Sequence, residues 1–138
     1  MTDAINFFQS LFTLRSFAPA APAVTVTSGV YRLATSLRSD ARMLAAIGDE
    51  EKTNGTRSQA LVFGEKDGSK RKMFAEITMW HHGHALENYR KSAQRFDEAA
   101  RIQTGKTKAF QVMAKEMRKR ASQIEVSMDQ LHELLENN

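Results

Sequence analysis

Apolar residues recur at alternating steps of three and four positions along the C-terminal part of the chain. These positions form one seam, made of Leu86, Tyr89, Ala93, Phe96, Ala100, Gln103, Thr107, Phe110, Ala114, Met117, Ala121, Ile124, Met128, Leu131 and Leu135. Only Gln103 and Thr107 are polar, and the phase holds for about seven heptads, more than the three or four that indicate a coiled coil. The pattern predicts a mainly α-helical protein with a long coiled-coil-type helix over residues 84–138.

The seam alternates between small and large side chains. The small set is Ala93, Ala100, Thr107, Ala114 and Ala121, and the large set is Tyr89, Phe96, Phe110, Met117 and Ile124. Small residues let two helix backbones approach closely, and large residues of the facing helix fill the adjacent layer. This alternation favours an antiparallel helical hairpin or a ring of close-packed helices over a parallel two-stranded coil.

Gly105 lies between the two polar seam positions and leaves two alternatives. It either turns the chain, giving a helical hairpin of residues 84–103 and 107–136, or it lies inside one helix at a cost of about 1 kcal/mol. We favour the single helix, because a loop has no reason to preserve the heptad phase. Such a helix would be about 75 Å long and could not bury its seam on the rest of the chain. We therefore expect a homo-oligomer in which the seam residues contact neighbouring copies.

Residues 1–23 are predicted to form an apolar helical arm and its connector. Segment 3–17 has a wide apolar helical face, made of Ile5, Phe7, Phe8, Leu11, Phe12 and Leu14. The APAAPA stretch at 18–23 predicts a stiff, extended connector. Arg15 is the only cation of the segment, whereas helices that lie on membranes usually carry more positive charge. We therefore favour docking on protein over a membrane surface, and both remain open.

The region 24–83 reads as a small helical body. A second short helix is predicted from Gly29 to Ile47, because apolar residues repeat there at helical spacing and Thr27 or Ser28 can cap its start. Gly48 is a plausible end of this helix. The polar residues 49–59 then predict a loop.

The segment near 60–79 has two readings. Asp67-Gly68 stands between two apolar runs, which predicts a small two-stranded β-hairpin. The alternative is that the long helix already starts near Ser69, a reading that fits the helical spacing of Met73, Ile77, Trp80 and His84.

Composition narrows the class of protein. A chain of 138 residues forms one domain, or one small domain with extended arms. A mean hydropathy of -0.48 is that of a soluble protein, and neither a signal peptide nor a membrane-spanning run is visible. We expect a cytoplasmic or virion location. The absence of cysteine excludes disulfides, thiolate zinc sites and cysteine nucleophiles.

Candidate catalytic and metal chemistry is sparse. The HHGH cluster at 81–84, followed by Glu87, contains side chains that bind zinc or titrate near neutral pH. No third convergent ligand is predictable, so surface or interface histidines are favoured. The GKT sequence at 105–107 has Ala100 where a phosphate-binding loop needs glycine. No nucleophile and base can be paired, and we expect neither enzyme activity nor a metal or cofactor.

Positive charge is the main indication of a nucleic-acid-binding role. The net charge is +4, and a basic block at 106–120 precedes an acidic block at 121–138, which favours staggered or antiparallel partners. Candidate nucleic-acid contacts are Lys66, Lys70, Arg71, Lys72, Lys115, Arg118, Lys119 and Arg120. No base-reading motif accompanies them.

In layout, the FFQSLF arm, the APAAPA connector and the alanine-rich heptads resemble the small helical internal proteins of short-tailed bacteriophages. The resemblance implies a virion component that leaves the particle and helps to build a conduit for DNA. It also implies that the alanine seam forms subunit contacts and that the arm meets membrane or a neighbour. Two alternatives remain: a nucleic-acid-associated accessory protein, and a soluble coiled-coil adaptor or inhibitor.

Overall fold

The computed structural model describes residues 22–137. This range contains the helices α2 (Pro22–Gly64), α3 (Gly68–Ile102) and α4 (Thr107–Glu136), and a short 3₁₀ turn η1 (Thr104–Lys106) precedes α4. No strand occurs within the range, so the prediction of a mainly α-helical protein is confirmed. The predicted arm helix at 3–17, with its apolar face from Ile5 to Leu14, lies outside the described residues.

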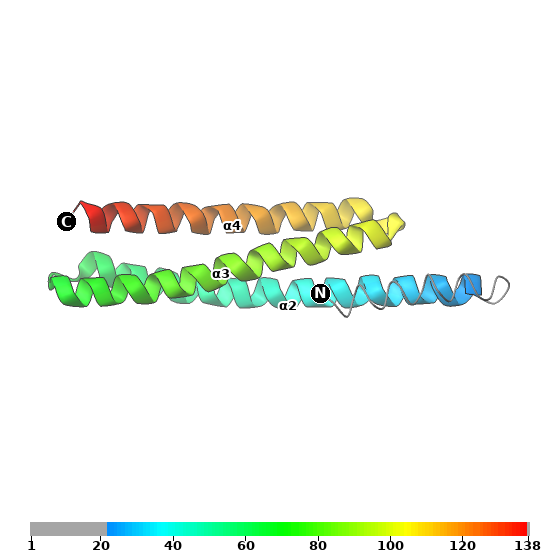
Figure 1. Cartoon of the computed structure of the whole chain (residues 1–138), viewed down its shortest axis with the longest axis horizontal. Coiled ribbons are helices and arrows are strands. Elements are labelled where there is room, and N and C mark those ends of the chain that lie inside the picture. Colours follow the sequence, from blue (N-terminus) through cyan, green and yellow to red (C-terminus); the bar gives the residue numbers. More distant parts are fainter. Residues whose placement is uncertain (1–21, 138) are drawn as a thin grey trace.

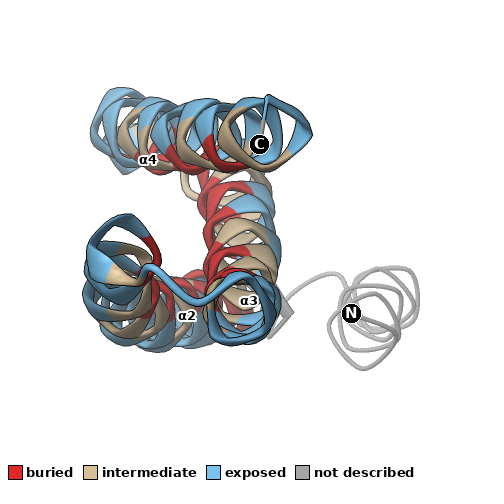
Figure 2. Ribbon diagram, turned by 90° about the vertical axis from the view of Figure 1, so that its left-hand side faces the viewer, coloured by how far each residue is buried: buried red, intermediate tan, exposed pale blue. Residues whose placement is uncertain are grey.

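The helices form an open arrangement around α3. In Figure 1, α3 runs antiparallel to both α2 and α4. Figure 2 shows α2 and α4 on different sides of α3, and they touch each other at very few points. Helix α3 therefore supplies nearly all the packing surface for the other two helices.

Helix α2 is longer than expected, and two predictions fail there. Gly48 does not end a helix, and residues 49–59 are helical instead of forming a loop. The segment is polar and contains residues of low helix propensity such as Thr53, Asn54 and Gly55, so its helicity depends on packing against α3, where Gly55 meets the His82 ring. The Oγ1 atoms of Thr53 and Thr56 also donate to the carbonyls four residues earlier, at 3.0 and 2.9 Å. The first residue of α2 is Pro22, so the end of the predicted extended connector is helical, and proline is well suited to a first turn.

The two glycines of α2 face rings of α3. A Cβ atom added to Gly48 would lie 2.7 Å from Cε1 of Tyr89, and one added to Gly55 would lie 2.5 Å from Nδ1 of His82. Both rings therefore rest directly on the α2 backbone. Glycine serves here to allow close approach, and not to break the helix.

Small residues continue this close contact along α2. Buried small residues recur every seven positions, at Ala34, Ala41, Gly48 and Gly55. The Oγ atom of Ser92 donates to the carbonyl oxygen of Ala41 at 2.6 Å. Small residues of α2 thus face larger side chains of α3, the same pairing of small and large residues that the sequence shows in the C-terminal seam.

The α2–α3 connection shows why the predicted β-hairpin near 60–79 is wrong. Asp67 caps α3, because its Oδ1 atom accepts hydrogen bonds from the backbone N–H groups of Ser69 at 2.9 Å and Lys70 at 3.1 Å. The Arg71 guanidinium donates to the carbonyl oxygen of Glu65 at 2.9 and 3.1 Å, which closes the turn. The Asp-Gly pair is therefore a helix start and not a strand turn. The alternative of a helix starting near Ser69 is the correct one.

A long C-terminal helix is confirmed, but it does not continue through Gly105. Helix α3 ends at Ile102, and residues 103–106 turn the chain into α4. The Thr107 hydroxyl donates to the carbonyl oxygen of Ala100 at 2.9 Å, which ties the new helix to the end of the old one. Seam residues on both sides of this turn, such as Ala100 and Phe110, belong to the same buried cluster.

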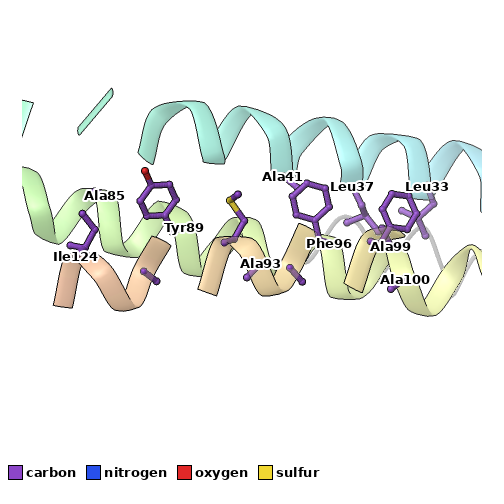
Figure 3. Close-up of a cluster of buried hydrophobic side chains, with 14 residues drawn as sticks. Leu33, Leu37, Ala41, Ala85, Tyr89, Ala93, Phe96, Ala99, Ala100 and Ile124 are labelled. Carbon is purple, nitrogen blue, oxygen red and sulfur yellow. The ribbon is translucent and has the colours of Figure 1, made fainter. Parts of the chain in front are cut away.

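The seam residues pack mostly inside this chain. The main buried cluster contains Leu33, Leu37, Ala41, Ala85, Tyr89, Ala93, Phe96, Ala99, Ala100, Phe110, Ala114, Met117, Ala121 and Ile124 (Figure 3). The rings of Phe96 and Phe110 stack with their centroids 6.4 Å apart. Leu86 and Met128 flank this cluster, and Leu131 and Leu135 join a second cluster around Val62 and Ala75. The helix length that led us to expect a homo-oligomer therefore no longer requires one.

Replacing Gly48 with alanine tests the contact between ring and backbone. We expect Gly48→Ala to lower the free energy of unfolding by about 1–3 kcal/mol, because the new methyl group overlaps the Tyr89 ring. Gly83→Ala is the control, since a Cβ there meets no atom within 4 Å, and it should stabilise α3 by up to about 1 kcal/mol. Urea unfolding followed by circular dichroism measures both, and equal effects of the two variants would contradict the packing described.

Candidate interaction surface

A row of large apolar side chains stands exposed on α3. Two faces of this helix are covered by α2 and α4. On the remaining face, Met73 is 49% exposed, Ile77 41% and Trp80 58%. Steps of four and three residues place these side chains side by side on one helical face. We name Met73, Ile77 and Trp80 the apolar stripe.

Polar residues bound the apolar stripe at both ends. Trp80 packs against His84, with ring centroids 4.3 Å apart, and edge-on against His81 at 4.9 Å. Lys70 lies one turn before the stripe and Glu87 one turn after His84, and both are exposed. The Glu87 carboxylate pairs with Lys91 at 2.8 Å, and this hydrogen bond lowers the pKa of Glu87. The stripe therefore ends in a cation on one side and an anion on the other.

The histidines of the HHGH cluster diverge. His81 Nδ1 lies 2.6 Å from a Glu51 carboxylate oxygen, and His84 packs on Trp80. His82 is buried, with Nε2 at 3.0 Å from Oε1 of Gln59. Within residues 22–137 no three metal-binding side chains converge.

His82 has a perturbed titration. Its Nδ1 atom has no hydrogen-bond partner and lies beside Gly55, so the neutral ring carries its proton on Nε2 and donates to Gln59. Burial lowers the pKa of His82 below 6.5, and the positive charges of His81 and Lys52 lower it further. The ring is therefore a buried neutral group of the α2–α3 interface.

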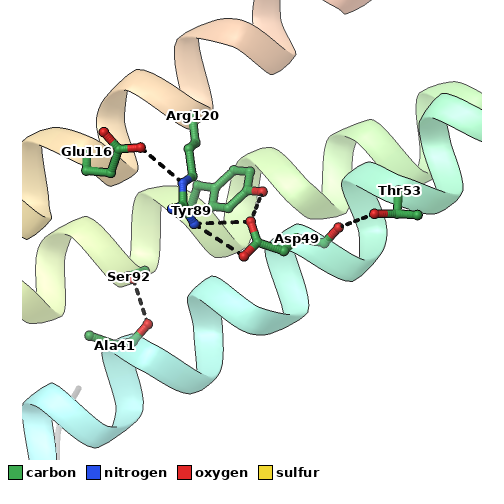
Figure 4. A network of polar contacts seen from close by, with 7 residues as sticks. All are labelled: Ala41, Asp49, Thr53, Tyr89, Ser92, Glu116 and Arg120. Atoms are coloured by element: carbon green, nitrogen blue, oxygen red, sulfur yellow. Dashed lines mark hydrogen bonds and ion pairs between the residues drawn. The ribbon is translucent and has the colours of Figure 1, made fainter.

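One polar network joins α2 and α4 across α3. The Tyr89 hydroxyl donates to Oδ1 of Asp49 at 2.5 Å, and Nη1 of Arg120 lies 3.2 Å from both oxygens of the same carboxylate (Figure 4). Nε of Arg120 lies 3.4 Å from a Glu116 oxygen. Burial and the Asp49 hydrogen bond raise the pKa of Tyr89, so the phenol stays protonated and acts as a structural donor.

The candidate nucleic-acid residues fall into separate groups. Lys66, Lys70 and Lys72 are exposed near the α2–α3 turn, whereas Arg71 is turned toward the Glu65 carbonyl. On α4, Lys115 and Lys119 are exposed. Arg118 pairs with Asp97 and Arg120 with Asp49, so neither arginine is available as a free cation. The two groups do not form one basic surface, because they are separated by roughly 35 Å along α3.

A hollow lies beside η1, between the end of α3 and the start of α4. Its lining is Gln94, Asp97, Ala100, Arg101, Thr107 and Gln111. Asp97 is already paired with Arg118, and no nucleophile with an adjacent base lines the hollow. The apolar stripe is the stronger candidate for a functional surface.

The heptad pattern of the sequence does not predict that the apolar stripe is an exposed interaction surface. The spacing of Met73, Ile77, Trp80 and His84 is visible in the sequence, where it predicts a helix. A single row at helical spacing does not reveal whether it faces a core or solvent. The structure decides this, because Ala75, Thr78 and His82 are the buried residues of this part of α3.

Searches against protein-family models, curated proteins and solved structures gave no match. Among residues 22–137, no helix combines the length and apolarity needed to cross a membrane. The functional proposal therefore depends on the surface of this chain alone.

Titration of His82 should make the fold sensitive to acid. Because the pKa of His82 is lower in the folded chain than its ordinary value of 6.5, the unfolded chain binds the proton more readily. The contribution of neutral His82 to the free energy of unfolding is full above pH 6.5, the ordinary pKa, and is lost as the pH falls below that value. We expect the urea midpoint to fall between about pH 7.5 and about pH 5.5.

The variant His82→Gln isolates this effect. It should reduce the difference in urea midpoint between the two pH values, whereas the exposed His132→Gln should leave that difference as in the unmodified chain. An equal pH dependence in the unmodified chain and in His82→Gln would show that another group is responsible.

The Tyr89–Asp49–Arg120 network can be tested by a double-mutant cycle. Asp49→Ala should cost about 1–3 kcal/mol of stability, because it leaves the buried Tyr89 hydroxyl without an acceptor. In a Tyr89→Phe background the same change should cost clearly less. Arg120→Ala, which removes a largely exposed pair, should cost at most about 1 kcal/mol. Equal costs of Asp49→Ala in both backgrounds, measured by urea unfolding, would contradict the coupling.

Proposed function

We propose that this chain is a non-enzymatic helical assembly protein that binds partner helices through the apolar stripe of α3. The observation that carries the proposal is the exposure of Met73, Ile77 and Trp80 beside a core that is already closed. Adjacent large apolar side chains on a protein surface usually mark an interaction site. Tryptophan in particular is enriched among the residues that dominate binding energy.

The position of α3 supports this role. Helix α3 is held on two sides by α2 and α4, so its third face is presented on a preformed helix. A preformed binding helix loses little conformational entropy on association, and an apolar helical face is a common recognition surface for another helix.

The layout resemblance to internal proteins of short-tailed bacteriophages is compatible with this proposal. A place in a virion or a DNA-delivery conduit belongs to the same proposal. The alanine seam, which the resemblance assigns to subunit contacts, is occupied by the chain's own helices. The apolar stripe takes its place as the contact surface, and the apolar arm from Ile5 to Leu14 is a second candidate contact, with protein or a membrane surface.

A nucleic-acid-associated role is the second candidate. Lys108, Lys115 and Lys119 are exposed and fall on one face of α4, where they could follow a phosphate backbone. DNA binding should then weaken steeply between low and moderate salt. Lys115→Ala with Lys119→Ala should weaken it further, whereas Lys66→Ala with Lys72→Ala is the matched control on the other group. Absence of DNA binding at low salt would exclude this role.

Trp80→Ala tests the assembly proposal. The full chain should show a mass that rises with concentration in analytical ultracentrifugation, and Trp80→Ala should weaken this association about tenfold or more. Trp80 is the only tryptophan, so its fluorescence should shift to shorter wavelength as the stripe becomes buried. Val126→Ala, at an exposed valine of α4, is the matched control. A monomer at all concentrations, or equal association of the two variants, would contradict the proposal.

A further inference from the structure

The exposed face of α3 carries a complete short heptad seam. Its positions are Lys70, Met73, Ile77, Trp80, His84 and Glu87, with steps of three, four, three, four and three residues. We name these six residues the α3 seam. His84 is partly exposed, and the other five residues are exposed. The α3 seam lies away from residues through which α3 contacts α2, such as His82 and Ser92.

The α3 seam is self-complementary when two copies meet antiparallel. In antiparallel coiled coils, a residue of one type of seam position packs beside a residue of the other type on the facing helix. A two-fold axis between Ile77 and Trp80 pairs these two residues in the central layers. Met73 then faces His84 in the next layers, and Lys70 faces Glu87 in the outermost ones. All six positions are paired in this single register.

We propose that the partner of the apolar stripe is a second copy of this chain, bound antiparallel through the α3 seam. This inference rests on the proposed function and names the partner of the same surface. The two Ile77–Trp80 layers supply the apolar centre of the interface. The two Lys70–Glu87 layers close its ends with opposite charges.

Charge selects the direction of the two helices. A parallel pair would place Lys70 beside Lys70 and Glu87 beside Glu87, whereas the antiparallel pair joins opposite charges at both ends. Like charges at an interface act against the wrong partner arrangement. Glu87 already pairs with Lys91 of its own helix, so in the dimer it lies between two cations.

The arm helix that the sequence predicts at 3–17 lies outside the described residues, and its predicted length argues against it as the occupant of the α3 seam. The Gln59–His82 contact places the seam beside the C-terminal part of α2, about 55 Å along the helix from Pro22. If residues 3–17 are helical and 18–21 extended, the arm spans only about 35 Å. A second copy, in contrast, brings a complementary surface of matching length.

Charge exchange tests the register with full-length protein. Lys70→Glu and Glu87→Lys should each weaken the dimer about tenfold or more, because each variant places like charges in both outer layers. A mixture of the two variants should form heterodimers of unmodified affinity, since each outer layer then again joins opposite charges. The double variant Lys70→Glu/Glu87→Lys should dimerise by itself. Sedimentation equilibrium at low and moderate salt measures all four cases.

Cross-linking supplies a measurement that does not depend on charge. The chain has no cysteine, so a mixture of Lys70→Cys and Glu87→Cys should give a disulfide-linked dimer on mild oxidation. Each variant alone should give little cross-link. Lys70 and Glu87 are exposed, and circular dichroism should show every variant folded as the unmodified chain.

The outcomes separate this inference from the assembly proposal. Unchanged association of both charge variants, or equal cross-linking of single cysteine variants and their mixture, would overturn the antiparallel dimer. If Trp80→Ala still weakened association in that case, the assembly role of the stripe would stand with another partner or register. A chain that is monomeric at all concentrations would overturn both.

Discussion

The contact of two α3 rings with the glycine backbone of α2 is the constraint on which the rest of the fold depends. Tyr89 lies on Gly48 and His82 on Gly55, and neither position tolerates a Cβ atom without a shift. This contact keeps α2 continuous through a polar segment and fixes the position of α3 along α2. It also aims the Tyr89 hydroxyl at Asp49, which Arg120 of α4 also contacts. Tyr89 therefore links the packing of α2 and α3 to the position of α4.

The open arrangement has a direct consequence for the surface. In a closed three-helix bundle each helix contacts both others, but here α2 and α4 each pack mainly on α3. Helix α3 is thus buried on two sides and free on a third. Apolar residues on that third side are displayed in a fixed geometry, because both neighbouring helices hold the displaying helix in place.

Much of the helical content follows from the sequence, because the seam from Leu86 to Leu135 and the repeat around Leu33 and Leu37 have a clear helical period. The sequence does not show the roles of Gly48 and Asp67-Gly68. Glycine can end a helix or allow an aromatic ring to approach closely, and Asp-Gly can form a β-turn or start a helix. Which role applies depends on the partner that lies opposite, such as Tyr89 for Gly48. The break at Gly105 cannot be read from the sequence, because the heptad phase is the same on both sides of residues 103–106 as in a single continuous helix. For the apolar stripe, spacing predicts a face, but only the placement of α2 and α4 shows that this face meets solvent.

Helix α4 is attached by a limited set of contacts. It packs along one side of α3, meets α2 mainly through the exposed ion pair between Arg120 and Asp49, and follows a short turn at 103–106. Its departure would leave the α2–α3 hairpin with its ring and glycine contacts intact. We expect helix α4 to open locally at a lower free energy than the α2–α3 hairpin, because α4 packs mainly on α3 alone. In amide hydrogen exchange the chain would therefore behave as two layers of unequal protection.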